Sequence, residues 1–154
     1  MKKLKLLLGA LLLIVMSSNM ALAQDEITDD DLRKYAVLSQ AIEYMKKDIS
    51  IELNKMIKAQ EGMTGQRYKE LSAAKGDEAK YNEMGAQDFE KKFMALVNEM
   101  MDERKEALVS VNSELATKMV GDKGRVYKSI KAALDEDEAV KARYEAILAQ
   151  VKGE

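Results

Sequence analysis

The stretch from Thr28 to Gln60, TDDDLRKYAVLSQAIEYMKKDISIELNKMIKAQ, decides the fold class of this chain. Its large apolar residues recur every three or four positions, the spacing that places side chains along one side of an α-helix. Thr28 can cap the helix, Asp31 adds a weak variant of a capping box, and Gly62 follows as a C-terminal stop. The stretch therefore predicts one long amphipathic helix. Its inner stripe is Tyr35, Leu38, Ile42, Met45, Ile49, Leu53 and Met56.

Helical spacing continues over the rest of the chain, without the alternation that is typical of strands. A short helix is predicted from about Gln66 to Lys75, and a long one from about Asp77 to residue 120 with Gly85 weakening its start. A short helix from about 125 to 134 and a closing helix from Asp135 follow. The helix over 77–120 would be roughly 65 Å long, so we expect it to bend or to project and pair with another chain. The predicted fold is all-α, with two long and three short helices.

Two four-residue turns open the two central short helices and lie 59 residues apart, Gly62-Met63-Thr64-Gly65 and Gly121-Asp122-Lys123-Gly124. The same offset relates Tyr68 to Tyr127 and Leu71 to Ile130. We expect the first glycine of each turn to adopt the left-handed conformation that ends a helix, and the second to let the chain turn back closely. The chain is thus predicted to contain two tandem units, each a long helix, a G-x-x-G turn and a short helix, followed by a closing helix.

Residues 1–23 have the organisation of a secretory signal peptide. Its parts are a basic start (Lys2, Lys3 and Lys5), an apolar run (Leu6 to Met16) and a small-residue cleavage site (Ala21-Leu22-Ala23). The apolar run is shorter than the roughly 20 residues of a membrane-spanning helix. We expect cleavage after Ala23, so that residues 24–154 form a single all-α domain. That domain is predicted to be exported, periplasmic or secreted, and to keep no stable membrane anchor.

The composition removes most routes to catalysis. The chain contains no Cys and no His, the residues that most often serve as nucleophile, general base or transition-metal ligand. Removing the three leader lysines leaves 22 basic against 27 acidic residues, a mildly acidic balance without a basic footprint for nucleic acid. The sequence therefore predicts a protein that is not an enzyme, needs no cofactor and does not bind nucleic acid.

Acidic clusters and methionines are the remaining candidates for metal chemistry. The clusters at 29–31 and 135–138 fit helix N-termini better than calcium loops, because the sixth position counted from Asp135 is Val140 rather than Gly. Met100 and Met101 are adjacent thioethers that could bind Cu(I). Methionine is more often an adaptable filler of cores and grooves, and that interpretation is preferred here.

Two short motifs resemble a family of exported bacterial helical proteins of unknown function. The first is the D-x-x-L pattern of Asp29-Asp30-Asp31-Leu32, which leads to Tyr35. The second is the Y-x-x-I-x-x-A pattern from Tyr127 through Ile130 to Ala133, followed by Asp137. Val140 and Glu138 stand where the family tends to have Leu and Pro. The resemblance implies a helical fold and an exported location, and it implies no activity.

The sequence hypothesis is a non-catalytic exported protein that binds other envelope proteins in a chaperone-like way. Mixed-charge helices with methionine-rich apolar faces can re-pack around different partners. The alternatives are a self-associating structural module and a carrier of a small ligand or Cu(I). The candidate interaction or packing residues are Tyr68, Leu71, Tyr127, Ile130, Met100 and Met101, with Gly62, Gly65, Gly121 and Gly124 at the turns.

Overall fold

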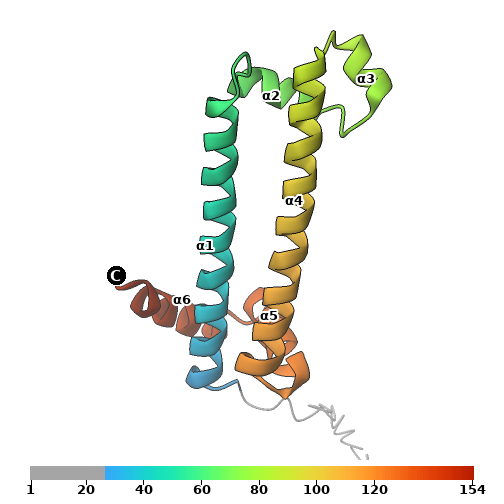
Figure 1. The fold of residues 1–154 in the computed structure, drawn as a ribbon. Helices are drawn as coiled ribbons and strands as arrows, with labels where there is room; N and C mark the ends of the chain where they lie inside the picture. The colour runs from blue at the N-terminus through green and yellow to red at the C-terminus, as the bar shows by residue number, and fades with distance from the viewer. Residues whose placement is uncertain (1–26) are drawn as a thin grey trace, which may run out of the picture.

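The computed structural model describes residues 27–154, and the predicted signal peptide therefore lies outside the described residues. Within that range the fold is all-α and contains two long helices, as predicted (Figure 1). The helices are α1 (Asp29–Ala59), α2 (Gly65–Ser72), α3 (Glu78–Glu83), α4 (Asp88–Glu114), α5 (Arg125–Glu136) and α6 (Glu138–Lys152). A π-helical turn (Leu115–Val120) and a 3-10 turn (Asp122–Gly124) join α4 to α5.

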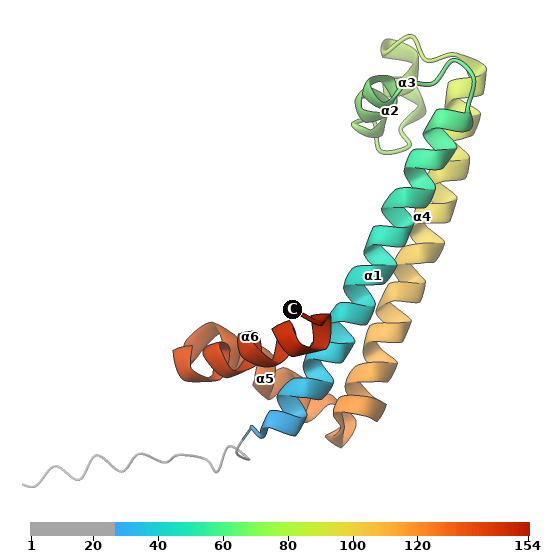
Figure 2. The same cartoon turned by 90° about the vertical axis from the view of Figure 1, so that its left-hand side faces the viewer.

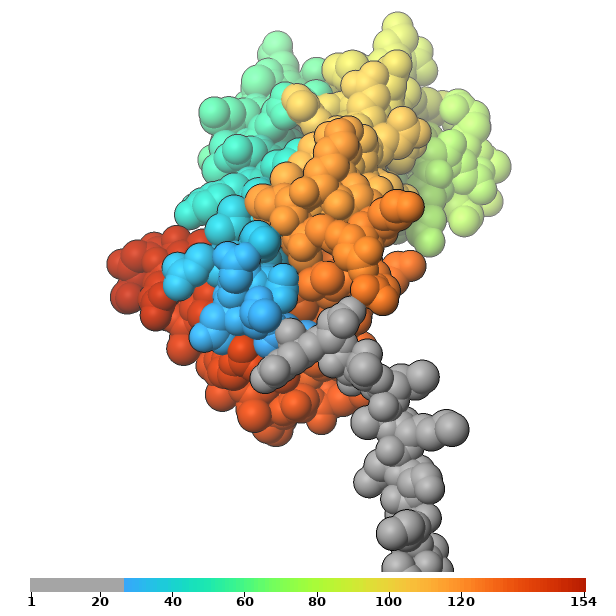
Figure 3. Space-filling view, turned by 90° about the horizontal axis from the view of Figure 1, so that it is seen from below, coloured from blue at the N-terminus to red at the C-terminus, as the bar shows by residue number. Residues whose placement is uncertain are grey.

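The two long helices form an antiparallel hairpin, and the short helices lie at its two ends. Figure 1 shows α2 and α3 at the end where α1 finishes and α4 begins, with α5 and α6 at the opposite end. Figure 2 shows that both groups of short helices project to the same side of the hairpin. The molecule is therefore concave on that side, with the middle of α1 and α4 as its floor. Figure 3 views the α5 and α6 end in space-filling form, with α1 and α4 receding behind it.

The start of α1 confirms the predicted cap. The Thr28 hydroxyl accepts a hydrogen bond from the Asp31 N–H at 3.1 Å, and the Asp31 carboxylate accepts one from the Thr28 N–H at 3.1 Å. Each bond satisfies a backbone donor that the helix leaves free. At the other end Gly62 has φ +80°, as expected of a residue that follows a helix and reverses the chain.

The predicted long helix over 77–120 is wrong in its first part. Asp77 caps the short helix α3, and the chain then leaves helical geometry at Gly85, where φ is +63°. A new helix, α4, begins at Asp88, where Gln87 and Glu90 form a capping box. The separate caps of α3 and α4 favour two helices over one bent helix. At the far end of α4, the residues after Glu114 form the π-helical turn rather than a continuation of the α-helix.

The predicted start of the last helix at Asp135 is also wrong. Asp135 lies inside α5, which continues to Glu136. The cap of α6 is Asp137, whose carboxylate accepts hydrogen bonds from the N–H groups of Ala139 and Val140 at 2.8 and 3.2 Å. Either aspartate could cap a helix. Asp137 lies directly before α6, so its carboxylate reaches the free N–H groups two and three residues further along the chain, whereas Asp135 lies inside α5.

The two G-x-x-G turns differ in both glycines. Gly62 has φ +80°, in line with the prediction, whereas Gly121 has φ +106° and ψ −178°, which lies outside the left-handed helical conformation, so the prediction for this glycine is wrong. Gly124 is left-handed, at φ +86°, as the chain reversal predicts. Gly65 instead begins α2 in helical conformation behind the Thr64 cap, so the prediction for the second glycine is wrong in the first turn. A side-chain cap opens α2, whereas a left-handed glycine opens α5.

The hydrophobic core is divided into two clusters, one at each end of the hairpin. The upper cluster consists of Ile57, Met63, Leu71, Ala74, Tyr81, Phe93, Met94 and Val97. The lower cluster consists of Leu32, Ala36, Leu38, Ala116, Val120, Ile130 and Ile147. No residue from 39 to 56 on α1 or from 98 to 115 on α4 and the following turn is buried. The middle of the hairpin therefore has no core of its own.

Candidate protein-binding surface

A groove runs between α1 and α4 in the middle of the hairpin, where neither cluster reaches. It has a volume of about 370 Å³. Its apolar base is formed by Ile49 of α1 with Met101 and Leu108 of α4, all of them half-buried. Its polar lining is Lys46, Ser50, Asp102, Arg104 and Lys105. We call it the concave groove, for the reason that follows.

The helix period shows on which side this groove opens. Ala36 is buried under the lower helices, and Ile57 is buried at the upper end. Ser50 follows Ala36 by 14 residues and precedes Ile57 by 7, and positions a whole number of heptads apart lie within about 40° of one another around a helix. Ser50 therefore points to the side that the end helices cover, which is the concave side of the hairpin in Figure 2.

A second groove of about 300 Å³ opens on the other side of the hairpin. It shares Ile49 and Arg104 with the concave groove and adds Asp48 and Glu52 from α1. Asp48 follows Lys46 by two residues, a rotation of about 200° around the helix. The two grooves consequently differ in charge: lysines line the concave side, and carboxylates line the outer side.

Arg104 ties the two long helices together at mid-height. Its guanidinium donates to both carboxylate oxygens of Glu52, at 3.2 and 3.0 Å. Both bonds come from the same nitrogen, Nη2, and both side chains are about half exposed, at 49% and 45%. A pair of this kind contributes under about 1 kcal/mol. The pair also explains why a charged residue occupies a position on the apolar stripe of α4: it fixes the helix spacing where no apolar core does.

The charge of Arg104 is balanced by Glu52, whereas the lysines of the concave groove are not balanced in this way. Among residues 27–154, the Lys46 and Lys105 ammonium groups form no ion pair or hydrogen bond. They come from different helices and stand beside the same apolar base. Asp102 is the carboxylate of this groove. The concave groove thus combines an uncovered apolar surface with two ammonium groups available to a ligand.

The tyrosines and aliphatic residues selected from the sequence lie at the ends of the molecule, outside the groove. Leu71 and Ile130 are both 0% exposed and belong to the upper and lower clusters respectively. Tyr68 and Tyr127 are half-buried beside the same clusters. The structure does not bring the two pairs together, because each closes its own end of the hairpin.

Tyr127 belongs to a group of three aromatic rings at the lower end. The Tyr35 ring lies 5.3 Å from that of Tyr127 and 5.6 Å from that of Tyr144. Burial, reinforced by the two neighbouring phenols, raises the pKa of Tyr35 to about 12. The Tyr35 phenol is therefore neutral at physiological pH, and the three rings pack α5 and α6 against α1.

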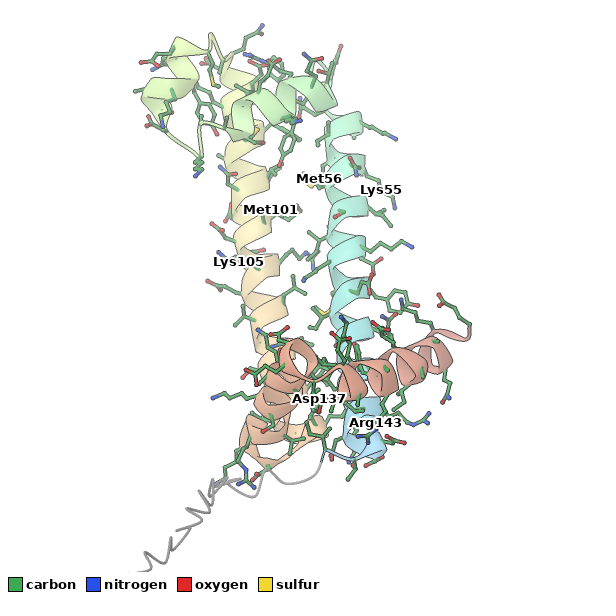
Figure 4. The ribbon with its side chains drawn as sticks, turned by 180° about the vertical axis from the view of Figure 1, so that it is seen from behind. Lys55, Met56, Met101, Lys105, Asp137 and Arg143 are labelled. Atoms are coloured by element: carbon green, nitrogen blue, oxygen red, sulfur yellow. The ribbon has the colours of Figure 1, made fainter. Side chains whose placement is uncertain are left out.

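Of the two methionines selected from the sequence, only Met101 lines the groove. Figure 4 shows Met101 on α4 and Met56 on α1 next to the space between the helices, and both pack against the upper cluster. Met100 is one residue away, about 100° around the helix, so the two sulfurs do not share a face. Met63 and Met94 are buried in the upper cluster, and methionine is thus a main constituent of this end of the core.

The most buried ion pair holds the upper end together and was not predicted. Glu90 is 4% exposed and accepts from Arg67 at 2.6 and 2.9 Å and from the Gln87 N–H at 2.8 Å. Hydrogen bonds from Arg67, with that from Gln87, hold the pKa of Glu90 below its ordinary value. Arg67 also donates to the carbonyls of Met84 and Gly85 at 3.3 and 3.4 Å. One guanidinium therefore joins α2, the turn after α3 and the start of α4.

Sequence reasoning recovered the apolar base of the groove but not its lysines. Ile49 and Leu108 belong to the helical spacing, and Met101 was a candidate packing residue. Lys46 and Lys105 resemble any solvated lysine until the end helices show which side of the hairpin is concave. In residues 27–154 no group of three or more His, Cys, Asp or Glu side chains is arranged to hold a metal ion. None of the helices in this range is long and apolar enough to cross a membrane.

Comparisons with known proteins add no relative to this description. No protein-family model, no curated protein and no solved structure matches the chain. The functional argument therefore depends on the geometry of the grooves and on the sequence.

Proposed function

We propose that this is a non-catalytic, exported protein that binds segments of other envelope proteins on its concave face, in a chaperone-like way. The observation that carries the proposal is the uncovered middle of the hairpin. Ile49, Met101 and Leu108 present an apolar base there that the chain does not bury itself. An apolar groove between two helices is a common receptor for an amphipathic helix or a partly unfolded segment.

The shape of the molecule supports binding on this face rather than elsewhere. The short helices at both ends project to the concave side and form two walls around the floor (Figure 2). A segment lying along the floor would be enclosed at both ends, while the two clusters stay intact. Met101 and Met56 border the floor (Figure 4), and their flexible side chains can adapt to partners of different shape.

The residues of the grooves also favour binding over catalysis. The chain has no His or Cys. Among the carboxylates of the two grooves, Glu52 is engaged by Arg104. The proposed export depends on the leader at residues 1–23, which has the three parts of a secretory signal.

Crosslinking in living cells tests this function. A photoreactive residue replaces Ser50 on the floor, and in a matched variant it replaces Lys55, which Figure 4 shows on the side of α1 away from α4. We expect protein crosslinks from position 50 and few from position 55, identified by mass spectrometry. Equal crosslinking from both positions, or none from position 50, would contradict binding on the concave face.

Self-association is a second candidate, and a different surface favours it. Val37, Tyr44 and Ile51 are exposed at 42%, 61% and 42% and follow one another at intervals of seven residues along α1. An apolar heptad stripe is the pattern with which helices pair. Light scattering over a range of concentrations checks it: a mass that rises with concentration, and that Tyr44→Lys lowers, is the expected result.

A further inference from the structure

The concave groove has a charge pattern that specifies its occupant more closely than an apolar surface alone. Lys46 on α1 and Lys105 on α4 stand beside the apolar base, one from each helix. Neither ammonium group has a carboxylate partner among residues 27–154, although the chain as a whole carries a net charge of −2. A local surplus of positive charge beside an apolar surface favours a ligand that carries carboxylates next to its apolar side chains.

The outer groove provides an internal comparison. It uses the same Ile49 and the same Arg104, but its other charged residues are Asp48 and Glu52. Glu52 neutralises Arg104, so the remaining charge of this second groove is the carboxylate of Asp48. Because Glu52 also neutralises Arg104 for the concave groove, the remaining charged residues there are Lys46, Lys105 and Asp102, which give a net positive charge. The two grooves between α1 and α4 therefore share part of their apolar surface and carry opposite charge.

We propose that the concave groove receives an acidic amphipathic segment of a partner protein. This inference rests on the proposed function and adds the chemistry of the partner. Apolar side chains of the segment lie on Ile49, Met101 and Leu108. Carboxylates on its two flanks lie beside Lys46 and Lys105, whereas Asp102 repels a carboxylate placed opposite it and so fixes the register of the segment.

The test uses two synthetic helical peptides with the same length and the same apolar residues. One carries Glu on both flanks of its apolar stripe, and the other carries Lys. Fluorescence anisotropy of the labelled peptides, titrated with the full chain at low and physiological salt, gives both dissociation constants. We expect the Glu peptide to bind more tightly, with an affinity that falls as salt rises because exposed charges are screened.

Charge reversal at the groove identifies the residues responsible. The double variant Lys46→Glu/Lys105→Glu is expected to weaken binding of the Glu peptide about tenfold or more and to strengthen binding of the Lys peptide. Lys55→Glu is the matched control, since that lysine lies on the other side of α1 (Figure 4), and it is expected to change neither affinity by more than about twofold. Circular dichroism confirms that all variants are folded.

The outcomes separate this inference from the proposed function. Equal affinity for the two peptides, or the same loss from Lys55→Glu as from the double variant, overturns the acidic specificity while leaving a protein-binding groove. Binding of neither peptide also overturns the specificity, and crosslinking from position 50 then decides the proposed function on its own. If the molecular mass doubles as concentration rises, and the double variant prevents this increase, a second copy of the chain occupies the groove. That result would contradict the inference.

Discussion

Gly62 and Gly65 occupy the same turn and have opposite structural roles. Gly62 has φ +80°, and a Cβ atom there would lie 2.8 Å from the Phe89 ring. Gly65 begins α2 in helical conformation, and a Cβ there meets nothing within 4 Å. We predict that Gly62→Ala lowers the free energy of unfolding by about 1–3 kcal/mol. Gly65→Ala should leave it unchanged or raise it by up to about 1 kcal/mol. Urea denaturation of the two variants side by side checks both signs.

Glu90 gives the upper end of the molecule a dependence on pH. Its pKa is lowered from the ordinary 4.5 in the folded state, so the unfolded chain takes up the proton first as pH falls. The stabilisation is therefore complete at pH values above 4.5 and is lost as pH decreases through the folded-state pKa. We predict that Glu90→Gln costs about 3 kcal/mol at pH 7, because it removes the buried carboxylate that pairs with Arg67. The cost should shrink in urea titrations below pH 4.5; a constant cost would contradict this assignment.

At the scale of the elements, α1 and α4 are each stable at their ends and weakly supported in the middle. Positions 39–56 and 98–115 contain no buried residue, and the ion pair of Arg104 with Glu52 is half exposed. Local opening needs little free energy where few apolar contacts are broken. We predict that amides in the middle of both helices exchange with deuterium faster than those near Leu38 and Val97. Uniform protection along α1 in a mass-spectrometric exchange experiment would refute the prediction.

The sequence predicts these elements well wherever a local signal decides them. The Thr28 cap, the long α1 and the stop at Gly62 all follow from residues within a few positions of one another. The break at Gly85 does not follow from the glycine alone, which a helix interior tolerates at a cost. The capping box of Gln87 and Glu90, whose glutamate is engaged by Arg67 23 residues earlier, is what makes α4 begin anew. The start of α6 at Asp137 rather than Asp135 has a similar cause: either aspartate can cap a helix, and the extent of α5 decides which one does.

The candidate surface was harder to predict because it depends on the whole molecule. Helical spacing identifies Ile49 and Leu108 as inward-facing, and they do face each other's helix. Helical spacing does not show that the short helices cover the inward-facing stripe at the two ends of the hairpin and leave it open in the middle. That depends on α2 and α5 both folding to one side of the hairpin (Figure 2), a consequence of turn geometry far from the groove.

At the scale of the whole molecule, the divided core predicts two separable ends. Leu71 and Ile130 correspond in the repeat, and both are 0% exposed in different clusters. We predict that Leu71→Ala and Ile130→Ala each cost about 2–5 kcal/mol, and that each raises hydrogen exchange mainly at its own end. The measurement is exchange mass spectrometry of the two variants under identical conditions. Loss of protection at both ends from either substitution would indicate one cooperative unit instead.

Because the middle of the hairpin has no core, the length of α1 and α4 can change without changing either hydrophobic cluster. A matched insertion of seven residues into α1 and α4 adds about 10.5 Å to the distance between the walls. It turns each helix by only about 20° from its former register, and neither cluster gains or loses a contact. Selection could thus lengthen or shorten the span to suit a longer or shorter guest without redesigning either core. The distance between the two ends of the hairpin can therefore change in steps of one heptad, while the clusters at the ends stay the same.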